Sequence, residues 1–482
     1  MARKLTLLFA VVVLMLSAVP AFGQDSLIES VCLVTDIGKI NDGTFNQFAY
    51  EGFERAFKDF GLDNTFIETQ APTDYDTNMS RCIDDGYDAI ITVGFLMTDA
   101  TLKRAQETPG VYFIGVDQFV QNGPENYAGL IFREDQSGFL AGALAGQLTK
   151  SNVIAGIYGI DVPAVKKFRN GYEQGAKFVN PDVTALGVYI DSFTAPDRGA
   201  AAAGQFLGEG ADVIFGAGGQ TGSGGITRAA QEGALVIGVD QDEFFTTFGN
   251  GETPGAENLI SSAVKRVDNA VYQAIEALVN GGEGWVGGSN IVMSADNDGI
   301  GFAPAHLAAD KVPQAVIDRT NEILAGLKDG SIVTGVDPIG GDLLPTIAEI
   351  VVAQSSAAAP EFTTLLAAVQ AAGLAETLTT GGPFTVFAPT DAAFAALPAG
   401  ALDGLLADKD ALTNVLLYHV VPGAVLAETV VGLSEATAAQ GSPISIEVKD
   451  GSVVLNGSAK VVTTDILARN GVIHVIDAVI LP

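Results

Sequence analysis

Residues 34–47, VTDIGKINDGTFNQ, place acidic, amide and aromatic side chains at the junction between a predicted strand and a predicted helix. The apolar run 31–35 is typical of a buried strand, and apolar residues recur at helical spacing from Phe45 onward. Open α/β sheets bind their ligands beyond the carboxyl ends of the strands. The stretch therefore predicts a binding site in an α/β domain, and the alternative is an ordinary turn capped by Asp or Thr.

Short apolar strands alternate with helical patterns along the first part of the chain. Such alternation predicts parallel sheets flanked by helices. A Gly- and Ala-rich helix at 136–148 separates two sets of strands, which predicts two α/β lobes with a crossing near 147–152. The segment 259–263 is predicted to cross back to the first lobe ahead of a helix at 267–279. Beyond the first strand, the predicted strands are 65–67, 89–93, 111–116, 153–157, 183–189, 213–215 and 234–239.

The pattern changes after about Val336, where a turn-rich cluster at 337–342 predicts a domain boundary. Helical repeats of Ala, Leu and Val follow the cluster, and apolar strand patterns dominate from 444 to 481. This order predicts a smaller α+β domain with a strand-rich end.

Charge and the first residues restrict the class of protein. The formal net charge is -32 with 25 Lys plus Arg residues, which argues against nucleic acid as a partner because such binding needs a basic face. Residues 1–23 have the basic, apolar and small-residue parts of a secretory signal, so we expect an exported protein. The apolar run is shorter than the roughly 20 residues of a membrane span.

The sequence has two cysteines, Cys32 in the first predicted strand and Cys82 in a predicted helix of the same domain. Export permits a disulfide. Both residues also occupy apolar positions, where a free cysteine packs as a small hydrophobe. The two interpretations stay open, and no zinc-binding spacing is present.

The residues that follow the predicted strands are polar or aromatic in both lobes. The carboxyl ends of parallel strands meet at one edge, so we expect these residues to converge on one cleft. Asp117 and Asp240 each follow an Ile-Gly-Val run, and each by itself could be a helix cap. Because such residues recur in both lobes, a binding site is favoured. In chain order the set is Asp36, Asp117, Phe193, Gly218, Asp240 and, past the returning segment, Lys265.

The aromatic members predict a flat ligand. Phe45 and Phe193 are placed to stack on the two faces of a ring, each contributing about 0.5–1.5 kcal/mol beyond area burial. Asp36 and Asn46 are placed to bind the polar edge of that ring.

The remaining members predict a sugar attached to the ring. Asp117 and Asp240 suit a vicinal diol, and Lys265 would keep both carboxylates ionised. A flat base carrying a diol indicates a nucleoside. The Gly-rich run 216–225 lacks the Gly-Lys-Ser/Thr ending of a phosphate-binding loop, so it predicts close backbone approach to a ligand or a flexible turn.

Residues 30–335 resemble the basic membrane protein family of exported solute-binding proteins, which deliver purine nucleosides to ABC transporters. The resemblance implies two lobes of the type I periplasmic-binding-protein fold that close over the ligand. It implies a base stacked by Phe45 and Phe193. Asp36 and Asn46 would bind the base edge. The resemblance also implies a ribose held by Asp117, Gly218, Asp240 and Lys265. The motifs on which the resemblance rests are 34–47, 114–118 with 237–241, 217–219 and 262–266.

The sequence departs from that family at three points. Lys39 and Thr44 stand where Gly and Ser are usual, the net charge is acidic, and no lipid-accepting Cys follows the signal. The last departure leaves the mode of tethering open.

The C-terminal part resembles a fasciclin domain through the motifs 384–394, 414–423 and 471–477. The resemblance implies extracellular adhesion or matrix contact, with Tyr418 and His419 as the family's named pair. A buried, hydrogen-bonded histidine is the more frequent role of such a residue, and the same holds for His474.

We therefore expect a signal peptide at 1–23, a two-lobed solute-binding domain at 24–337, a linker at 338–344 and a fasciclin domain at 345–482. The expected function is capture of a purine nucleoside outside the cytoplasmic membrane, in the periplasm or at the cell surface, for an ABC permease. The alternatives are an adhesion or matrix protein whose α/β part is a sensor or spacer, and a nucleosidase. No catalytic motif, cofactor or metal site is expected.

Overall fold

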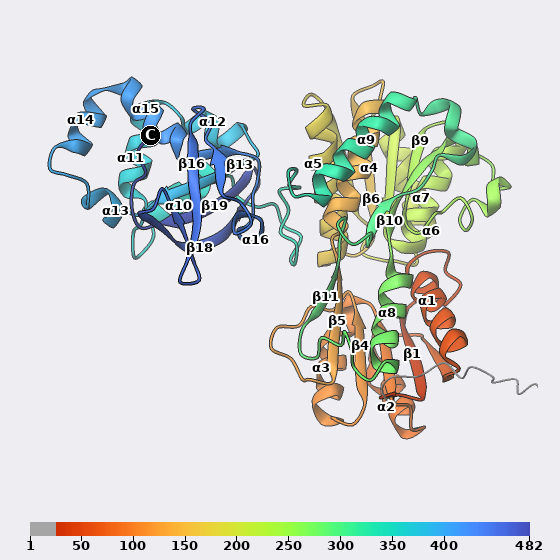
Figure 1. The fold of residues 1–482 in the computed structure, drawn as a ribbon. Helices are drawn as coiled ribbons and strands as arrows, with labels where there is room; N and C mark the ends of the chain where they lie inside the picture. Colours follow the sequence, from red (N-terminus) through yellow and green to blue (C-terminus); the bar gives the residue numbers. More distant parts are fainter. Residues whose placement is uncertain (1–25) are drawn as a thin grey trace, which may run out of the picture.

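The computed structural model describes residues 26–482, and the predicted signal at 1–23 lies outside the described residues. Three sheets organise this part of the chain, two of six strands and one of seven. Figure 1 shows two α/β lobes, one above the other, with the seven-stranded domain beside the upper lobe. The structure confirms the predicted fold class of a two-lobed α/β part followed by a smaller α+β domain.

The first lobe is a parallel sheet in the order β11-β5-β4-β3-β1-β2. Alternate residues of β1 face opposite layers: Leu33 packs with α1 and α8, and Val34 packs with α2. Burial on both faces explains why this strand is a continuous apolar run. The elements are β1 (Ser30–Ile37), α1 (Phe45–Phe60), β2 (Asp63–Thr69), α2 (Tyr75–Asp84), β3 (Ala89–Val93), α3 (Thr98–Glu107), β4 (Tyr112–Val116), β5 (Tyr127–Phe132), α8 (Val267–Val279) and β11 (Asn290–Met293).

The second lobe is a sheet in the order β12-β10-β9-β8-β6-β7, with β12 antiparallel to β10. Its Gly-rich helix α4 packs closely on α5: a Cβ at Gly142 would lie 1.9 Å from the carbonyl oxygen of Tyr172. The small residues therefore permit helix contact. The elements are α4 (Glu134–Leu148), β6 (Val153–Tyr158), α5 (Pro163–Val179), β7 (Thr184–Tyr189), α6 (Pro196–Gly208), β8 (Val213–Ala217), α7 (Gly219–Gln231), β9 (Leu235–Asp240), β10 (Leu259–Lys265), β12 (Ile300–Phe302) and α9 (Gln314–Lys328).

The chain crosses between the lobes three times: after β5, after β10, and between β11 and β12. The predicted crossing at 147–152 is wrong, because α4 already packs against α5 and β10 of the second lobe. The predicted crossing at 259–263 is also wrong, since those residues lie in β10 and the chain crosses just after it. The strands β5, β11 and β12 were not predicted, whereas the predicted helix at 267–279 is present as α8.

The C-terminal domain has a sheet in the order β14-β13-β19-β18-β17-β16-β15, in which only the β13–β19 pair is parallel. Helices cover one face of the sheet around Phe394 and Ile473. The helices are α10 (Ile347–Ser355), α11 (Thr363–Ala372), α12 (Ala375–Thr380), α13 (Asp391–Ala395), α14 (Ala401–Ala407), α15 (Lys409–Tyr418) and α16 (Ala427–Val430). The strands are β13 (Phe384–Pro389), β14 (Val420–Pro422), β15 (Glu435–Thr437), β16 (Pro443–Lys449), β17 (Ser452–Leu455), β18 (Ala459–Ala468) and β19 (Gly471–Ile476).

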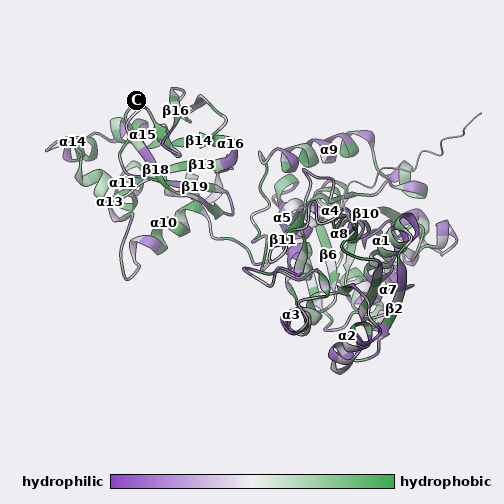
Figure 2. Ribbon diagram, turned by 60° about the horizontal axis from the view of Figure 1, so that its bottom comes forward, coloured by the Kyte–Doolittle hydropathy of each residue, from purple (hydrophilic) through white to green (hydrophobic). Residues whose placement is uncertain are grey.

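Hydropathy follows this layering. Figure 2 shows hydrophilic residues on the edge strand β2 and hydrophobic residues on β6 in the interior of the second sheet. Residues 63, 64 and 66 of β2 are exposed, as expected of a strand that pairs on one side only. No helix among residues 26–482 is long and apolar enough to cross a membrane.

A disulfide joins Cys32 of β1 to Cys82 of α2. Both residues are fully buried, so the bond fastens α2 to the sheet from inside the core. The structure thus decides between the two interpretations that the sequence left open.

The segment between the lobes and the C-terminal domain is fastened to the second lobe. The Lys166 ammonium lies 3.1 Å from a carboxylate oxygen of Asp342, and the Asn170 amide donates to the Gly341 carbonyl at 2.6 Å. Nearer the lobes, Thr334 donates a hydrogen bond to Asp135 at the start of α4. The segment therefore lies along α5 and is not a free tether.

Candidate functional site

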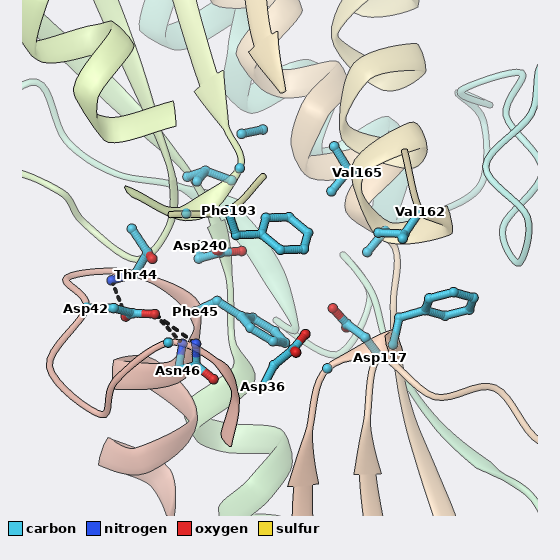
Figure 3. Close-up of a pocket in the computed structure, with 18 of the residues that line it drawn as sticks. Asp36, Asp42, Thr44, Phe45, Asn46, Asp117, Val162, Val165, Phe193 and Asp240 are labelled. Atoms are coloured by element: carbon cyan, nitrogen blue, oxygen red, sulfur yellow. Dashed lines mark hydrogen bonds between the residues drawn. The ribbon is translucent and has the colours of Figure 1, made fainter. Parts of the chain in front are cut away.

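A cleft lies between the two lobes. It is lined by turns that follow strands of both sheets, as the strand ends predict. Residues of β1 and α1 and residues that follow β3 and β4 lie on one side, and residues at or after the ends of β6, β7, β8 and β9 lie on the other (Figure 3). The structure brings all eight predicted site residues to this cleft: Asp36, Phe45, Asn46, Asp117, Phe193, Gly218, Asp240 and Lys265.

Asp117 and Asp240 adopt the same backbone conformation in the two lobes. Each ends an Ile-Gly-Val strand and has a positive φ, 61° and 65° respectively. Asp tolerates this left-handed region better than most residues. The shared turn directs both carboxyl groups into the cleft, where Figure 3 shows them on opposite walls.

Lys265 is the central cation of the cleft. Its Nζ lies 2.7 Å from Oδ2 of Asp117 and 2.8 Å from Oε1 of Glu134. The ammonium is fully buried, and its pKa is raised because the attraction of these carboxylates outweighs the effect of burial. Glu134 also pairs with Lys167 at 2.5 Å, so two lysines and two carboxylates form one buried network.

Sequence reasoning missed Glu134 and Lys167. Both belong to the hinge region: Glu134 begins α4 directly after β5, and Lys167 also donates to the carbonyl of Phe132 at 2.7 Å. One sequence feature could have revealed Glu134: the polar run 133–136 follows the apolar run 127–132, a pattern typical of a strand end.

Burial raises the pKa of both cleft carboxyl groups. The pKa of Asp240 rises to about 7, because burial outweighs the attraction of Lys265. The pKa of Asp117 is also raised, mainly by burial and against the opposing effect of Lys265. One carboxyl oxygen of Asp117, Oδ1, is buried and has no hydrogen-bond partner among residues 26–482. It is an acceptor available to a ligand.

The two phenylalanines come from opposite lobes. Phe45 begins α1, and Phe193 lies in the turn before α6; Figure 3 shows their rings facing the same space. The Lys265 Nζ lies 4.8 Å from the centroid of the Phe45 ring, a cation–π contact.

Gly218 provides room for Phe193. A Cβ at Gly218 would lie 2.2 Å from the backbone nitrogen of Gly159, and a Cβ at Gly159 would lie 2.5 Å from the Phe193 ring. Gly218 and Gly159 therefore allow the turns after β8 and β6 to approach each other and allow the ring to rest on them. Close approach to the Gly159 backbone explains Gly218, and the predicted flexible turn at 216–225 is wrong, because β8 extends to Ala217 and α7 begins at Gly219.

Asp36 and Asn46 present acceptors to the cleft. Tyr75 donates a hydrogen bond to Oδ1 of Asp36, and the Ile37 amide donates to the same oxygen at 2.6 Å. Burial raises the pKa of Asp36 despite these two donors. The Asn46 amide donates to Asp42 at 2.9 Å, and its Oδ1 is buried without a partner among the described residues. Tyr75 and Asp42 orient this pair and were not predicted.

An apolar wall completes the cleft. It was not predicted, because its residues come from the loop after β3 and from the first turn of α5, whose apolar positions look like ordinary core positions. The residues are Phe95, Leu96, Val162, Ala164, Val165 and Phe168.

The named pair of the C-terminal domain is packed in its core. Tyr418 donates to the Pro443 carbonyl at 2.8 Å. His419 is buried, with Nδ1 2.8 Å from the Val415 carbonyl and Nε2 accepting from the Ile480 amide at 3.1 Å. Burial lowers the pKa of His419 to about 4, so the ring is neutral. His474 is buried as well, which confirms the core interpretation for both histidines.

Metal binding has no support within the described part of the chain. No group of three or more His, Cys, Asp or Glu side chains in residues 26–482 is arranged to hold an ion.

Two family descriptions match the chain. Residues 29–328 match the ABC transporter substrate-binding proteins described as PnrA-like, and residues 360–482 match the fasciclin domain. Because the first match covers more than half of the chain, the protein belongs to the PnrA-like, or basic membrane protein, family of ABC transporter substrate-binding proteins, and it carries a C-terminal fasciclin domain.

Relatives that match parts of the chain occur in several bacteria. The chain is 28% identical over 307 residues to the ABC transporter nucleoside-binding protein BmpA of Lactococcus lactis, covering 61% of this chain and 86% of the relative. It is also 28% identical over 318 residues to a CD4+ T-cell-stimulating antigen of Listeria monocytogenes, covering 63% of this chain and 87% of that one. A Synechocystis protein is 54% identical over 123 residues, covering 25% of this chain and 67% of the relative.

Solved structures support the same fold. A solute-binding protein of Aeropyrum pernix superposes with a TM-score of 0.56 at 24% identity, covering 64% of this chain and 94% of that one. A solute-binding protein of Conexibacter woesei superposes with a TM-score of 0.52 at 23% identity, covering 64% of this chain and 99% of that one. At these identities the likeness concerns the fold alone.

Proposed function

We propose that the protein captures a purine nucleoside between its two lobes and delivers it to an ABC permease. The observation that carries this proposal is the arrangement of Phe45 and Phe193, from opposite lobes, in a cleft that is also lined by two carboxyl groups and one buried ammonium. A flat base fits between the rings. A vicinal diol fits the carboxylates, because each hydroxyl donates to an acidic acceptor.

The base edge is assigned to the first lobe. Asp36 and Asn46 each offer an acceptor: the Ile37 amide donates to Asp36 and holds it in place, and Asn46 is held by donating its own amide to Asp42. These acceptors suit ring N–H or amino groups. The Lactococcus relative, which is named a nucleoside-binding protein, supports the same ligand class for this chain.

The sugar is assigned to Asp117, Asp240 and Lys265. An ionised Asp117 beside Lys265 accepts from a hydroxyl through its unpartnered Oδ1. Lys265 itself has three donors, of which one is hydrogen-bonded to Asp117, and its ammonium forms an ion pair with Glu134 at 2.8 Å. A remaining donor is available to a sugar oxygen.

The fasciclin domain is proposed to tether or assemble the protein outside the cytoplasmic membrane. We place this domain at 345–482, after a linker at 338–344 and a two-lobed domain at 24–337. Solute-binding proteins of this family are extracytoplasmic, and fasciclin domains are extracellular, which supports an exported protein. An exported location also agrees with the disulfide, since such bonds persist in oxidising compartments.

Two other functions make different predictions. If adhesion is the main function, Asp117→Ala leaves attachment to cells or matrix unchanged and the cleft binds no nucleoside. If the protein is a nucleosidase, purified protein hydrolyses inosine and Asp117→Asn abolishes the reaction. We favour binding over catalysis, because the relatives are substrate-binding proteins and the sequence has no catalytic motif.

Calorimetry tests the proposal. The mature protein is unfolded and refolded to remove carried-over ligand, then titrated with guanosine, adenosine, inosine, cytidine and ribose. We expect binding of purine nucleosides and much weaker binding of cytidine and ribose. Absence of binding to all five compounds contradicts the proposal and favours the adhesion function.

A further inference from the structure

The Ile-Gly-Val-Asp-Gln sequence occurs twice, at 114–118 and at 237–241, and the two glutamines make different contacts. Gln118 is fully buried and bonds within its own lobe: its amide donates to the Gly94 carbonyl at 3.0 Å, and its oxygen accepts from Tyr127 at 3.0 Å. Gln241 instead reaches the other lobe. Its Nε2 donates to the carbonyl oxygen of Thr44 at 3.2 Å.

We propose that Gln241 is a latch that holds the two lobes closed, through its hydrogen bond to the Thr44 carbonyl. Gln241 does not line the cleft, so it is a positioning residue and not a ligand contact. This inference rests on the proposed function only in its choice of ligand, since the contact between the lobes exists independently of the ligand's identity.

The location of the bond supports a latch. The hinge strands β5 and β11 lie at one edge of the first sheet, whereas the turn that contains Thr44 follows β1, three strands from β5. At about 4.8 Å per strand the acceptor is roughly 14 Å from β5 on the first-lobe side, whereas Gln241 follows β9, the neighbour of the crossing strand β10. When the lobes rotate apart, the turn that contains Thr44 moves away from the second lobe and the bond breaks. The Lys265–Asp117 ion pair also joins the lobes, but Lys265 ends β10, where the chain crosses.

The residues around Thr44 and Gln241 bring the two lobes into close contact. A Cβ at Gly43, which has φ 80°, would lie 3.8 Å from the side chain of Thr246 in the second lobe. Thr44 is fully buried, and Gln241 is 7% exposed. The Thr44 carbonyl also accepts the first hydrogen bond of α1, from Phe48 at 3.0 Å, so its position is fixed by the helix. Because this acceptor is held rigidly, a single hydrogen bond from the Gln241 side chain can hold the two lobes together.

The latch is adjacent in sequence to the ligand residues on both sides. Thr44 precedes Phe45, and Gln241 follows Asp240. A ligand that draws these two turns together therefore aligns Gln241 with its acceptor. The bond is expected to slow ligand release and to leave ligand entry unchanged, because entry occurs while the lobes are apart.

Stopped-flow kinetics with inosine test the latch. Gln241→Ala is expected to raise the dissociation rate about 2- to 12-fold, the effect of one neutral hydrogen bond, with the association rate within about twofold of the wild type. Gln241→Glu keeps the size but has no donor, so it should release ligand at least as fast. Gln231→Ala, an exposed glutamine at the end of α7 in the same lobe, is the matched control and should match the wild type.

Three outcomes would overturn the latch. They are an unchanged dissociation rate in Gln241→Ala, slow ligand release in Gln241→Glu, and a variant that loses affinity only through slower association.

A second measurement separates failure of the latch from failure of the proposed ligand. Spin labels at Asp99→Cys on α3 and Ala201→Cys on α6, both exposed, report the lobe separation with and without inosine. Gln241→Ala is expected to shift the distances to longer values. Unchanged distances in both conditions would overturn the latch even if no nucleoside binds.

Discussion

Lys265, at the end of β10 in the second lobe, forms a 2.7 Å ion pair with Asp117, which follows β4 in the first lobe. The pair joins the two lobes inside the cleft, and both side chains are at least nine-tenths buried. Removing one partner of a buried pair leaves the other charge without compensation, which is strongly destabilising. In this protein Glu134 remains beside Lys265 and limits that cost.

Asp117→Asn is expected to weaken purine nucleoside binding by about 1.5–3 kcal/mol, roughly 10- to 150-fold, because a charged acceptor is lost. Isothermal calorimetry measures the change. Asp84→Asn, at the exposed end of α2 in the same lobe, is the control and should bind as the wild type does. Wild-type affinity in Asp117→Asn would contradict the assignment of the sugar to this carboxylate.

Binding should weaken as the pH falls through about 7, because the Asp240 carboxyl group, whose pKa is raised to about 7, must be ionised to accept from the ligand. We expect the affinity to fall by up to about tenfold per pH unit below this value. Asp240→Asn should remove this dependence. Glu243 also has a pKa raised to about 7 and contributes to the raised pKa of Asp240, so Glu243→Gln should keep the pH dependence but move its midpoint to lower pH.

Asp240 should also lower the stability of the ligand-free protein at neutral and higher pH. The folded-state pKa of about 7 lies above the unfolded value, so the folded state binds more protons and its stability falls as the pH rises from about 4 through 7. At about 1.4 kcal/mol per pKa unit, Asp240→Asn should raise the free energy of unfolding by up to about 4 kcal/mol at pH 8. Urea unfolding at pH 8 and pH 4 measures the difference, which should vanish at pH 4. A variant that is less stable than the wild type at pH 8 would contradict this sign.

Phe193→Leu is expected to weaken purine nucleoside binding by about 0.5–1.5 kcal/mol while its effect on a ligand without a base, such as ribose, stays small. The reason is that an aliphatic side chain fills the space but loses the stacking interaction. Phe119→Leu, an exposed phenylalanine of the first lobe that does not line the cleft, is the control. Equal losses for inosine and ribose would show that the ring does not contact the base.

The Cys32–Cys82 disulfide closes a loop with a sequence separation of 50, for which chain entropy gives a stabilisation of about 4 kcal/mol. The double variant Cys32→Ala, Cys82→Ala should lose about that much free energy of unfolding, measured by urea denaturation. Its nucleoside affinity should stay near that of the wild type, because neither residue lines the cleft. If the wild-type protein has the same urea unfolding midpoint under reducing and oxidising conditions, the disulfide does not have this stabilising role.

Local patterns in the sequence predicted most of the elements of the lobes and eight of the residues that line the cleft. They did so because strand ends in a parallel sheet converge whatever the order of the strands. Asp36, Asp117 and Asp240 therefore appear in the cleft although the predicted crossings at 147–152 and 259–263 are wrong. The residues of β5 were not recognised, and with them the polar run that starts at 133 was lost.

The sequence by itself determined the α/β character of the lobes, the strand-end residues and the separate C-terminal domain, because period, composition and turn residues are local properties. The tertiary structure alone decided which residues pair over long separations in the sequence. Glu134 reaches Lys265, Cys32 reaches Cys82 and Gln241 reaches Thr44 through contacts between residues 50 to about 200 positions apart. Identical motifs at Gln118 and Gln241 show the reason: the same five residues bond within a lobe or between lobes according to what the fold places opposite them.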